Sequence, residues 1–183
     1  MKTFAIIPEK FSADRVVNSL PDLLKSGVDY LYLRGMTNAD EICGLVKKLN
    51  KTEIIPVVSC KSCPENLEPV YGIHYKSSEI DLIAKKQLGC EIVTASAHDA
   101  DTAKDLLGKG VDYVYVSPVF SPFSKEADSR EFFPRDQIIR LISEFGERVV
   151  LLGGLTGDRL EKLRKSIKDD FSIAGINLFF NKT

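Results

Sequence analysis

The sequence lacks an excess of charge of either sign and lacks any long hydrophobic run. Its 183 residues hold 25 Lys and Arg against 26 Asp and Glu, a formal net charge of −1. A chain so near neutrality predicts no basic surface for nucleic acid or for a membrane, and we expect neither partner. No apolar run approaches the roughly 20 residues of a membrane span. The first run stops at Pro8, short of the roughly 7–15 residues of a signal-peptide core. The expected location is the cytoplasm.

Cysteine and histidine are scarce as well. A disulfide framework built from the four cysteines is unusual in the cytoplasm. Cys60 and Cys63 form a single C-x-x-C, whereas a structural zinc site needs four ligands. We therefore expect reduced cysteines. The two histidines, His74 and His98, are the side chains suited to proton transfer near neutral pH.

The sequence does contain a regular alternation of short apolar runs and amphipathic stretches. Nearly continuous apolar runs are typical of parallel strands covered on both faces. The predicted strands are Thr3–Pro8, Tyr30–Arg34, Ile54–Val58, Gly72–Tyr75, Glu91–Ser96, Tyr113–Val116, Val149–Gly153 and Ser172–Leu178. The intervening stretches carry helical spacing, as in the segment 138–145. Asp158 is the predicted cap of the last helix.

The segment Leu23–Arg34 is echoed by Leu106–Ser117, four units further along the chain. Each copy has the pattern of a helix end, a glycine stop at Gly27 or Gly110, and a strand. A fold of eight equivalent units produces such an echo. Similar local requirements that select similar residues are the alternative explanation.

Eight β/α alternations predict one domain over residues 1–183, a (β/α)₈ or TIM barrel. The rival is an open doubly wound sheet, but no glycine-rich fingerprint follows the first strand, where Ile7–Lys10 stands. The barrel is small, because such chains usually exceed roughly 200 residues. The chain also stops directly after the last strand, so the eighth helix is expected to be missing. The apolar flank that this leaves suggests a homodimer.

In such a barrel the site forms at the C-terminal ends of the strands. Gly153 and Gly154 follow the seventh strand, where backbone N–H groups can cradle a phosphate, and Asn177 adds a donor after the eighth. A plain turn is the alternative. Arg34 ends the second strand and suits a phosphate or a surface ion pair.

Five further residues at or near the strand ends are candidates. The long loop after the sixth strand carries Ser124 and Lys125, which suit an anion or belong to a solvated loop. His74 ends the fourth strand, His98 follows the fifth, and both are acid, base or ligand candidates. Glu79 is the best carboxylate for a metal, but no second carboxylate stands at a strand end.

These residues resemble the superfamily of thiamine phosphate synthase and TenI-like thiazole tautomerase, along nearly the whole chain. The stretches that carry the resemblance are Tyr32–Arg34, Gly72–Tyr75, Ser96–His98, Gly110–Val114, Pro118–Phe120 with Lys125, and Val149–Leu155. The resemblance implies a (β/α)₈ barrel. It also implies a transferase of thiamine biosynthesis that joins a pyrimidine methyl diphosphate to a thiazole phosphate with loss of pyrophosphate.

The same resemblance implies a role for each matching residue. Arg34 and Lys125 would hold the pyrophosphate, and Ser96 would hydrogen-bond the pyrimidine or its leaving group. Ser124, Gly153 and Gly154 would receive the thiazole phosphate. Mg²⁺ is the implied cofactor, with Glu79 as one ligand and Cys60 in place of the other.

The chain departs from the synthase pattern chiefly in the pyrophosphate and metal half of the site. The substituted positions are Tyr32, Met36, Ser59, Cys60, Ser77, Glu79, Pro122 and Ser124. A metal-free tautomerase fits the lost carboxylate, but its catalytic histidine falls on Pro118. A barrel that binds thiazole phosphate without catalysis is the third hypothesis.

Overall fold

The computed structural model describes residues 1–9, 11–67, 70–85, 90–121 and 131–180. Eight parallel strands are hydrogen-bonded in chain order, and the last pairs with the first to close a barrel. The strands are β1 (Thr3–Ile6), β2 (Tyr30–Tyr32), β3 (Ile55–Ser59), β4 (Gly72–Tyr75), β5 (Ile92–Ala97), β6 (Tyr113–Val116), β7 (Val149–Leu151) and β8 (Ser172–Gly175). The predicted (β/α)₈ barrel is confirmed.

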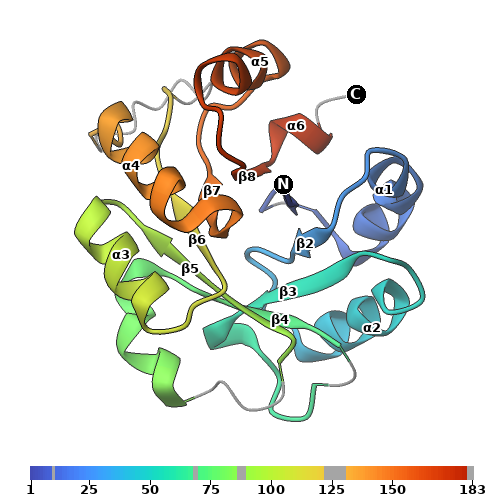
Figure 1. The fold of residues 1–183 in the computed structure, drawn as a ribbon. Coiled ribbons are helices and arrows are strands. Elements are labelled where there is room, and N and C mark those ends of the chain that lie inside the picture. Colours follow the sequence, from blue (N-terminus) through green and yellow to red (C-terminus); the bar gives the residue numbers. More distant parts are fainter. Residues whose placement is uncertain (10, 68–69, 86–89, 122–130, 181–183) are drawn as a thin grey trace.

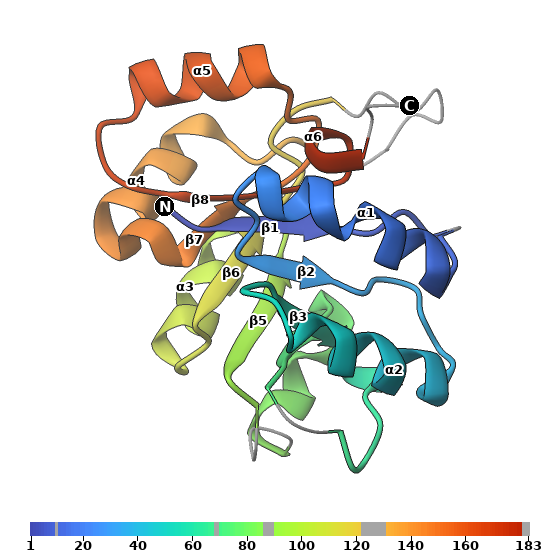
Figure 2. The same cartoon turned by 90° about the vertical axis from the view of Figure 1, so that its right-hand side faces the viewer.

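Helices surround the strands, and Figure 1 shows them as a ring outside the barrel. The α-helices are α1 (Ala13–Lys25), α2 (Ala39–Leu49), α3 (Ala100–Gly108), α4 (Arg135–Phe145), α5 (Gly157–Ser166) and α6 (Asn177–Phe180). Short 3₁₀ segments are η1 (Cys60–Ser62), η2 (Ser77–Lys85) and η3 (Gly146–Arg148). Turned by 90°, the molecule shows β1 and β2 side by side and pointing the same way (Figure 2). No helix in the described ranges is long and apolar enough to cross a membrane.

The end of the eighth unit differs from the prediction. β8 stops at Gly175, and Asn177 begins the single turn α6 rather than ending a strand that reaches Leu178. The apolar run continues through both elements, so hydrophobicity alone could not mark the boundary. The chain turns back there: a Cβ on Gly175 would lie 3.2 Å from the Leu178 side chain. The predicted homodimer stays a prediction.

The helical turn α6 stands where the sequence predicted no helix. It lies between α5 and α1 in Figure 1. Its Phe180 ring meets the ring of Phe11 edge-on, with centroids 5.3 Å apart, just before α1 begins. Part of the apolar flank is therefore covered within the chain itself.

The core forms two layers. An outer layer packs the helices on the strands, and a smaller inner cluster fills the barrel. The inner cluster is rich in aromatic rings: Phe4 stacks on Tyr30 at 4.5 Å and meets Tyr115 edge-on at 5.3 Å. These rings fill the interior of the barrel.

The start of α5 corrects one local expectation. Thr156, and not Asp158, caps the helix, because its side-chain oxygen accepts the N–H of Arg159. Asp158 lies in the first turn, where its charge still favours the helix N-terminus.

Candidate functional site

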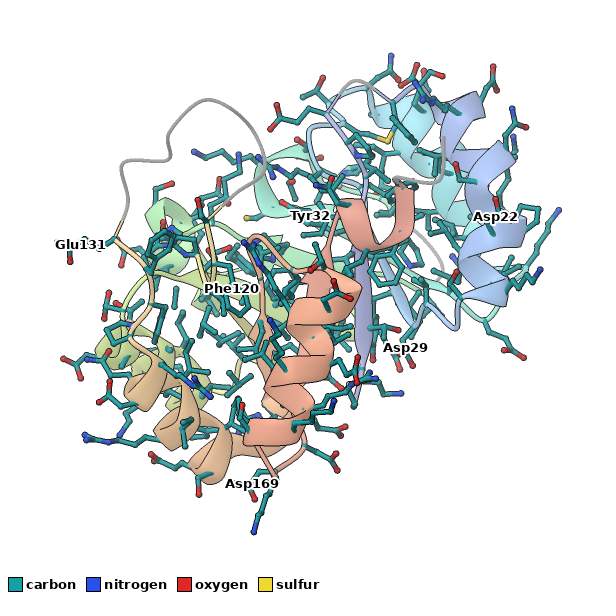
Figure 3. The ribbon with its side chains drawn as sticks, turned by 90° about the horizontal axis from the view of Figure 1, so that it is seen from above. Asp22, Asp29, Tyr32, Phe120, Glu131 and Asp169 are labelled. Carbon is teal, nitrogen blue, oxygen red and sulfur yellow. The ribbon has the colours of Figure 1, made fainter. Side chains whose placement is uncertain are left out.

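A cavity of about 570 Å³ opens where the strands end. Seven residues predicted from the sequence line it: Arg34, His74, Ser96, His98, Gly153, Gly154 and Asn177. Ser124 and Lys125 lie outside the described residues. In Figure 3 the lining residues Tyr32 and Phe120 lie toward the middle of the view, and Asp169 lies at its margin.

His74 forms the floor of this cavity. Its Nδ1 lies 2.8 Å from Thr94 Oγ1 and its Nε2 lies 2.9 Å from Ser96 Oγ. The ring lies between those of Tyr32 and Tyr115, with centroid distances of 4.6 and 4.8 Å. Burial, aided by nearby cationic side chains, lowers the pKa of His74 to about 3. The imidazole is therefore neutral over the ordinary pH range, and both of its nitrogens are engaged.

The ring of His98 is held by a backbone carbonyl group. Its Nδ1 lies 2.8 Å from the carbonyl oxygen of Ser117. A carbonyl oxygen can only accept, so Nδ1 carries the hydrogen and Nε2 of the neutral ring carries a lone pair. His98 lines the cavity, so it brings an acceptor and potential base to the site.

The turn after β7 requires glycine at two successive positions. Gly153 and Gly154 have φ angles of 104° and 61°. A Cβ on Gly153 would lie 3.0 Å from Pro118 Cα, and one on Gly154 would strike the carbonyl oxygens of Ser121 and Phe120. The carbonyls of the pair are used internally, by Phe120 N–H and by the Arg159 guanidinium. Within the described residues their N–H groups have no acceptor, an arrangement suited to an anion.

Arg34, which follows β2, brings a cation to the cavity. Its Nη2 donates to Glu9 Oε1 at 2.7 Å, and both side chains are substantially exposed. The structure thus combines the two alternatives of the sequence: an ion pair at the surface and a guanidinium that lines the cavity.

Glu79 does not line the cavity. Its side chain is 1% exposed, and its Oε1 lies 3.4 Å from Lys61 Nζ. Its Oε2 accepts the backbone N–H of Lys76 at 3.1 Å, at the start of η2. The carboxylate that the sequence suggested for a metal is thus engaged by a lysine and by the backbone.

Other donors near Glu79 do not form a cluster of ligands. Ser59 exchanges a hydrogen bond with the Tyr32 hydroxyl at 3.0 Å, and Cys60 is a buried thiol. Among the residues that the structure describes, no group of three or more His, Cys, Asp or Glu side chains is placed to hold a metal ion. Mg²⁺ prefers several oxygen ligands, so the residues present do not fit it.

Sequence reasoning missed several lining residues, among them Lys76, Ser117 and Phe120. All three follow β4 or β6, so the strand-end rule could have found them. Lys76 matters most, because it adds a second cation to the described lining.

The sequence matches a family model and two named relatives. A family model described as thiamine monophosphate synthase matches residues 66–175. A relative named putative thiamine-phosphate synthase 2, from Aquifex aeolicus, is 25% identical over 190 residues, which cover 97% of each chain. The thiamine-phosphate synthase of Geobacillus thermodenitrificans is 27% identical over 105 residues, or 56% of this chain and 47% of the relative.

A solved structure shares the fold. The thiamine phosphate pyrophosphorylase from Pyrococcus furiosus gives a TM-score of 0.69 at 19% identity, over 96% of this chain and 85% of that one. At this level of identity the likeness shows a common barrel.

Proposed function

Because the chain belongs to the thiamine monophosphate synthase family, we propose that it joins a pyrimidine methyl diphosphate to a thiazole phosphate. The bond between the pyrimidine methylene carbon and the diphosphate oxygen breaks, and its electron pair leaves on the diphosphate. The thiazole ring nitrogen supplies the electron pair of the new carbon–nitrogen bond. The chain is then a transferase of thiamine biosynthesis.

One observation carries this proposal: groups suited to two separate anions line a single cavity. The glycine turn after β7 offers backbone N–H groups, and Arg34 after β2 offers a guanidinium. A reaction between two phosphorylated substrates requires such a pair of subsites. Ser96, on β5, lies between them in the chain order of the barrel.

We assign the thiazole phosphate to Gly153, Gly154 and Asn177, with Ser124 as a further donor from the loop after β6. The diphosphate is assigned to Arg34 and Lys125, as the family pattern suggests. Lys76 joins them on the evidence of its position in the cavity lining. Fixed cations stabilise the charge that grows on the leaving diphosphate where it forms.

The family pattern also suggests Mg²⁺, but the donors described above do not match it. Glu79 is engaged by Lys61 and by the backbone, and Cys60 offers a soft thiol where the pattern has a carboxylate. We therefore assign no step to a metal, and the cationic side chains carry the neutralisation of charge.

The test is an assay for thiamine phosphate, oxidised to its fluorescent thiochrome form, with both substrates supplied. We expect Arg34→Gln to lower turnover about 100-fold, the size typical of removing one preorganised charge donor. Arg140→Gln, on the exposed face of α4, is the matched control and should leave turnover unchanged. Lys125→Ala should abolish the activity.

Two outcomes would contradict this proposal. Full activity in Arg34→Gln or Lys125→Ala would contradict the role assigned to that residue in binding the diphosphate. If this protein forms no product while an intact synthase assayed in parallel does, the proposed transferase reaction is wrong. Calorimetry with thiazole phosphate then tests the third hypothesis, a barrel that binds without turnover.

A second candidate, thiazole tautomerisation, is favoured by one specific observation. His98 lines the cavity with its Nδ1 held by a carbonyl oxygen, so the neutral ring has its lone pair on Nε2, an atom that can take a proton from a bound thiazole. His74 is unsuited to this task because both of its nitrogens are engaged. Conversion of the tautomer by wild type, and its survival in His98→Gln, would exclude this reaction for His98.

A further inference from the structure

Three side chains on neighbouring strands form a chain of hydrogen bonds with one direction. The hydroxyl of Thr94 donates to the Ile73 carbonyl oxygen at 3.3 Å. A hydroxyl has one proton, so at Nδ1 of His74, 2.8 Å away, Thr94 can only accept. Nδ1 therefore carries the ring hydrogen. Nε2 carries the lone pair and accepts the Ser96 hydroxyl at 2.9 Å.

From this direction we propose that Ser96 meets the cavity only as a hydrogen-bond acceptor, and that His74 and Thr94 are the positioning residues that keep it so. The ligand group seated on Ser96 must then carry an N–H or O–H donor. The inference rests on the proposed function and deepens it. An ionised diphosphate offers acceptors alone, so Ser96 contacts an N–H or O–H donor on the pyrimidine ring and not the leaving group.

Burial makes this direction difficult to reverse. His74 is 2% exposed and Thr94 is fully buried, so water cannot replace a lost partner on either side. If Ser96 turned its proton toward a diphosphate, Nε2 would be left as an unpaired buried acceptor. The rings of Tyr32 and Tyr115 enclose the imidazole and restrict its rotation. The low pKa of His74 agrees, since a neutral ring keeps its lone pair throughout the physiological range.

The first experiment needs no ligand. The chain has two histidines, so nitrogen-15 spectra of labelled protein contain two imidazoles, and His98→Gln assigns them. We expect His74 in the Nδ1–H form, with Nε2 at the shift of an unprotonated nitrogen. Thr94→Ser should keep this signature and Thr94→Val should lose it. A protonated Nε2 in the neutral wild-type ring would overturn the direction and the proposal with it.

The second experiment measures ligand choice by calorimetry. Three pyrimidine methyl diphosphates are compared, bearing amino, methylamino or methoxy at one ring position. Methylamino and methoxy are matched in size, but only methylamino retains an N–H. We expect methoxy to bind about 10-fold to 100-fold more weakly, because two acceptors then face each other. Ser96→Ala should remove this difference, and Ser77→Ala, another serine in the lining, should preserve it.

Inorganic diphosphate provides the opposite control. Its affinity should be the same, within about twofold, in wild type and in Ser96→Ala. Loss of diphosphate affinity in Ser96→Ala would overturn the inference, as would equal binding of the methylamino and methoxy compounds. If none of the pyrimidines binds, the proposed function itself fails, and the ligand assignment fails with it. In that case the nitrogen-15 spectra still test the direction of the hydrogen bonds, but not the ligand that Ser96 contacts.

Discussion

The two echoing segments, Leu23–Arg34 and Leu106–Ser117, are alike at one end of the barrel and different at the other. Each begins as the end of a helix and turns on a glycine of positive φ, 66° at Gly27 and 87° at Gly110. Each then enters a strand, β2 or β6, at the end of the barrel where the strands begin. We call this end the closed end, and the end with the cavity the mouth.

The likeness extends to hydrogen bonds. The N–H of Asp29 donates to the carbonyl of Thr3, and that of Asp112 donates to the carbonyl of Val93. In return, the Asp29 carboxylate accepts the Thr3 N–H at 2.8 Å, and the Asp112 carboxylate accepts the Val93 N–H at 2.7 Å. Each aspartate thus ties the start of its own strand to the start of the preceding strand. The same hydrogen-bond arrangement therefore recurs four units apart in the barrel.

At the mouth of the barrel the likeness ends. The first copy finishes on Arg34, a cation paired with Glu9, whereas the second finishes on Ser117, whose carbonyl fixes the ring of His98. The closed end repeats because it serves the barrel, and the mouth diverges because each strand end meets a different part of the cavity. Substitutions at the closed end should therefore change stability, and those at the mouth should change ligand binding.

The largest expected effect is at the mouth. Gly154→Ala places a Cβ against the carbonyl oxygens of Ser121 and Phe120, at a φ of 61°. The turn must shift, and displacement of a subsite by about 1 Å can cost about 100-fold. We expect calorimetry to show thiazole phosphate binding weakened by about that factor. Gly157→Ala, at the first residue of α5, is the control, since its Cβ would meet no atom within 4 Å. Equal losses in both variants would contradict the assignment of the turn.

Next come the paired aspartates of the closed end. Asn in place of Asp29 or Asp112 can turn an NH₂ group toward a backbone N–H that now lacks its acceptor. Each change should lower the free energy of unfolding by about 1–3 kcal/mol in urea titrations. Ligand affinity should not change. Asp169→Asn, at an exposed site, is the control. A stability loss at Asp29 without one at Asp112 would break the equivalence of the two segments.

The strands and the closed end were predictable because their causes are local. A buried parallel strand favours a continuous apolar run, and a glycine of positive φ is a common way to end a helix before a strand. Both signals are visible in the sequence, because Gly27 and Gly110 are each followed by an apolar run. The predicted end of the last strand was wrong because one apolar run forms both the strand β8 and the helical turn α6 that begins at Asn177.

The candidate site was predictable only as a set of positions. Strand ends placed Arg34, Ser96 and Gly153 at one cavity, but not their contacts. His74 meets Thr94 because the register of β4 on β5 sets the two opposite each other. Such a contact spans 20 positions of the chain and leaves no local pattern. The engagement of Glu79 by Lys61 is hidden for the same reason.

His74 should be the position where the two classes of effect meet, because it is buried and also contacts Ser96. The unfolded chain takes up a proton at histidine near pH 6.5, whereas the folded ring resists protonation to about 3. Stability from His74 is therefore complete above about pH 6.5 and declines below it by about 1.4 kcal/mol per pH unit.

Urea unfolding at pH 7.5 and pH 5 measures this contribution. Wild type should lose about 2 kcal/mol more than His74→Gln over that interval. His98→Gln is the matched control, since it leaves His74 in place and should keep that extra loss. If His74→Gln and wild type lose stability in parallel, the ring is not held neutral by the fold.

The smallest expected effect lies at Glu9, and it tests whether Arg34 belongs to the mouth or only to the surface. Glu9 Oε1 lies 2.7 Å from Arg34 Nη2, but the pair is exposed and therefore weak. Glu9→Gln should free the guanidinium and strengthen diphosphate binding about 2-fold to 5-fold, an effect that added salt should reduce. Unfolding should shift by less than about 0.5 kcal/mol. If diphosphate binding weakens instead, Glu9 orients Arg34 for its ligand, and the mouth has positioning contacts as specific as those of the closed end.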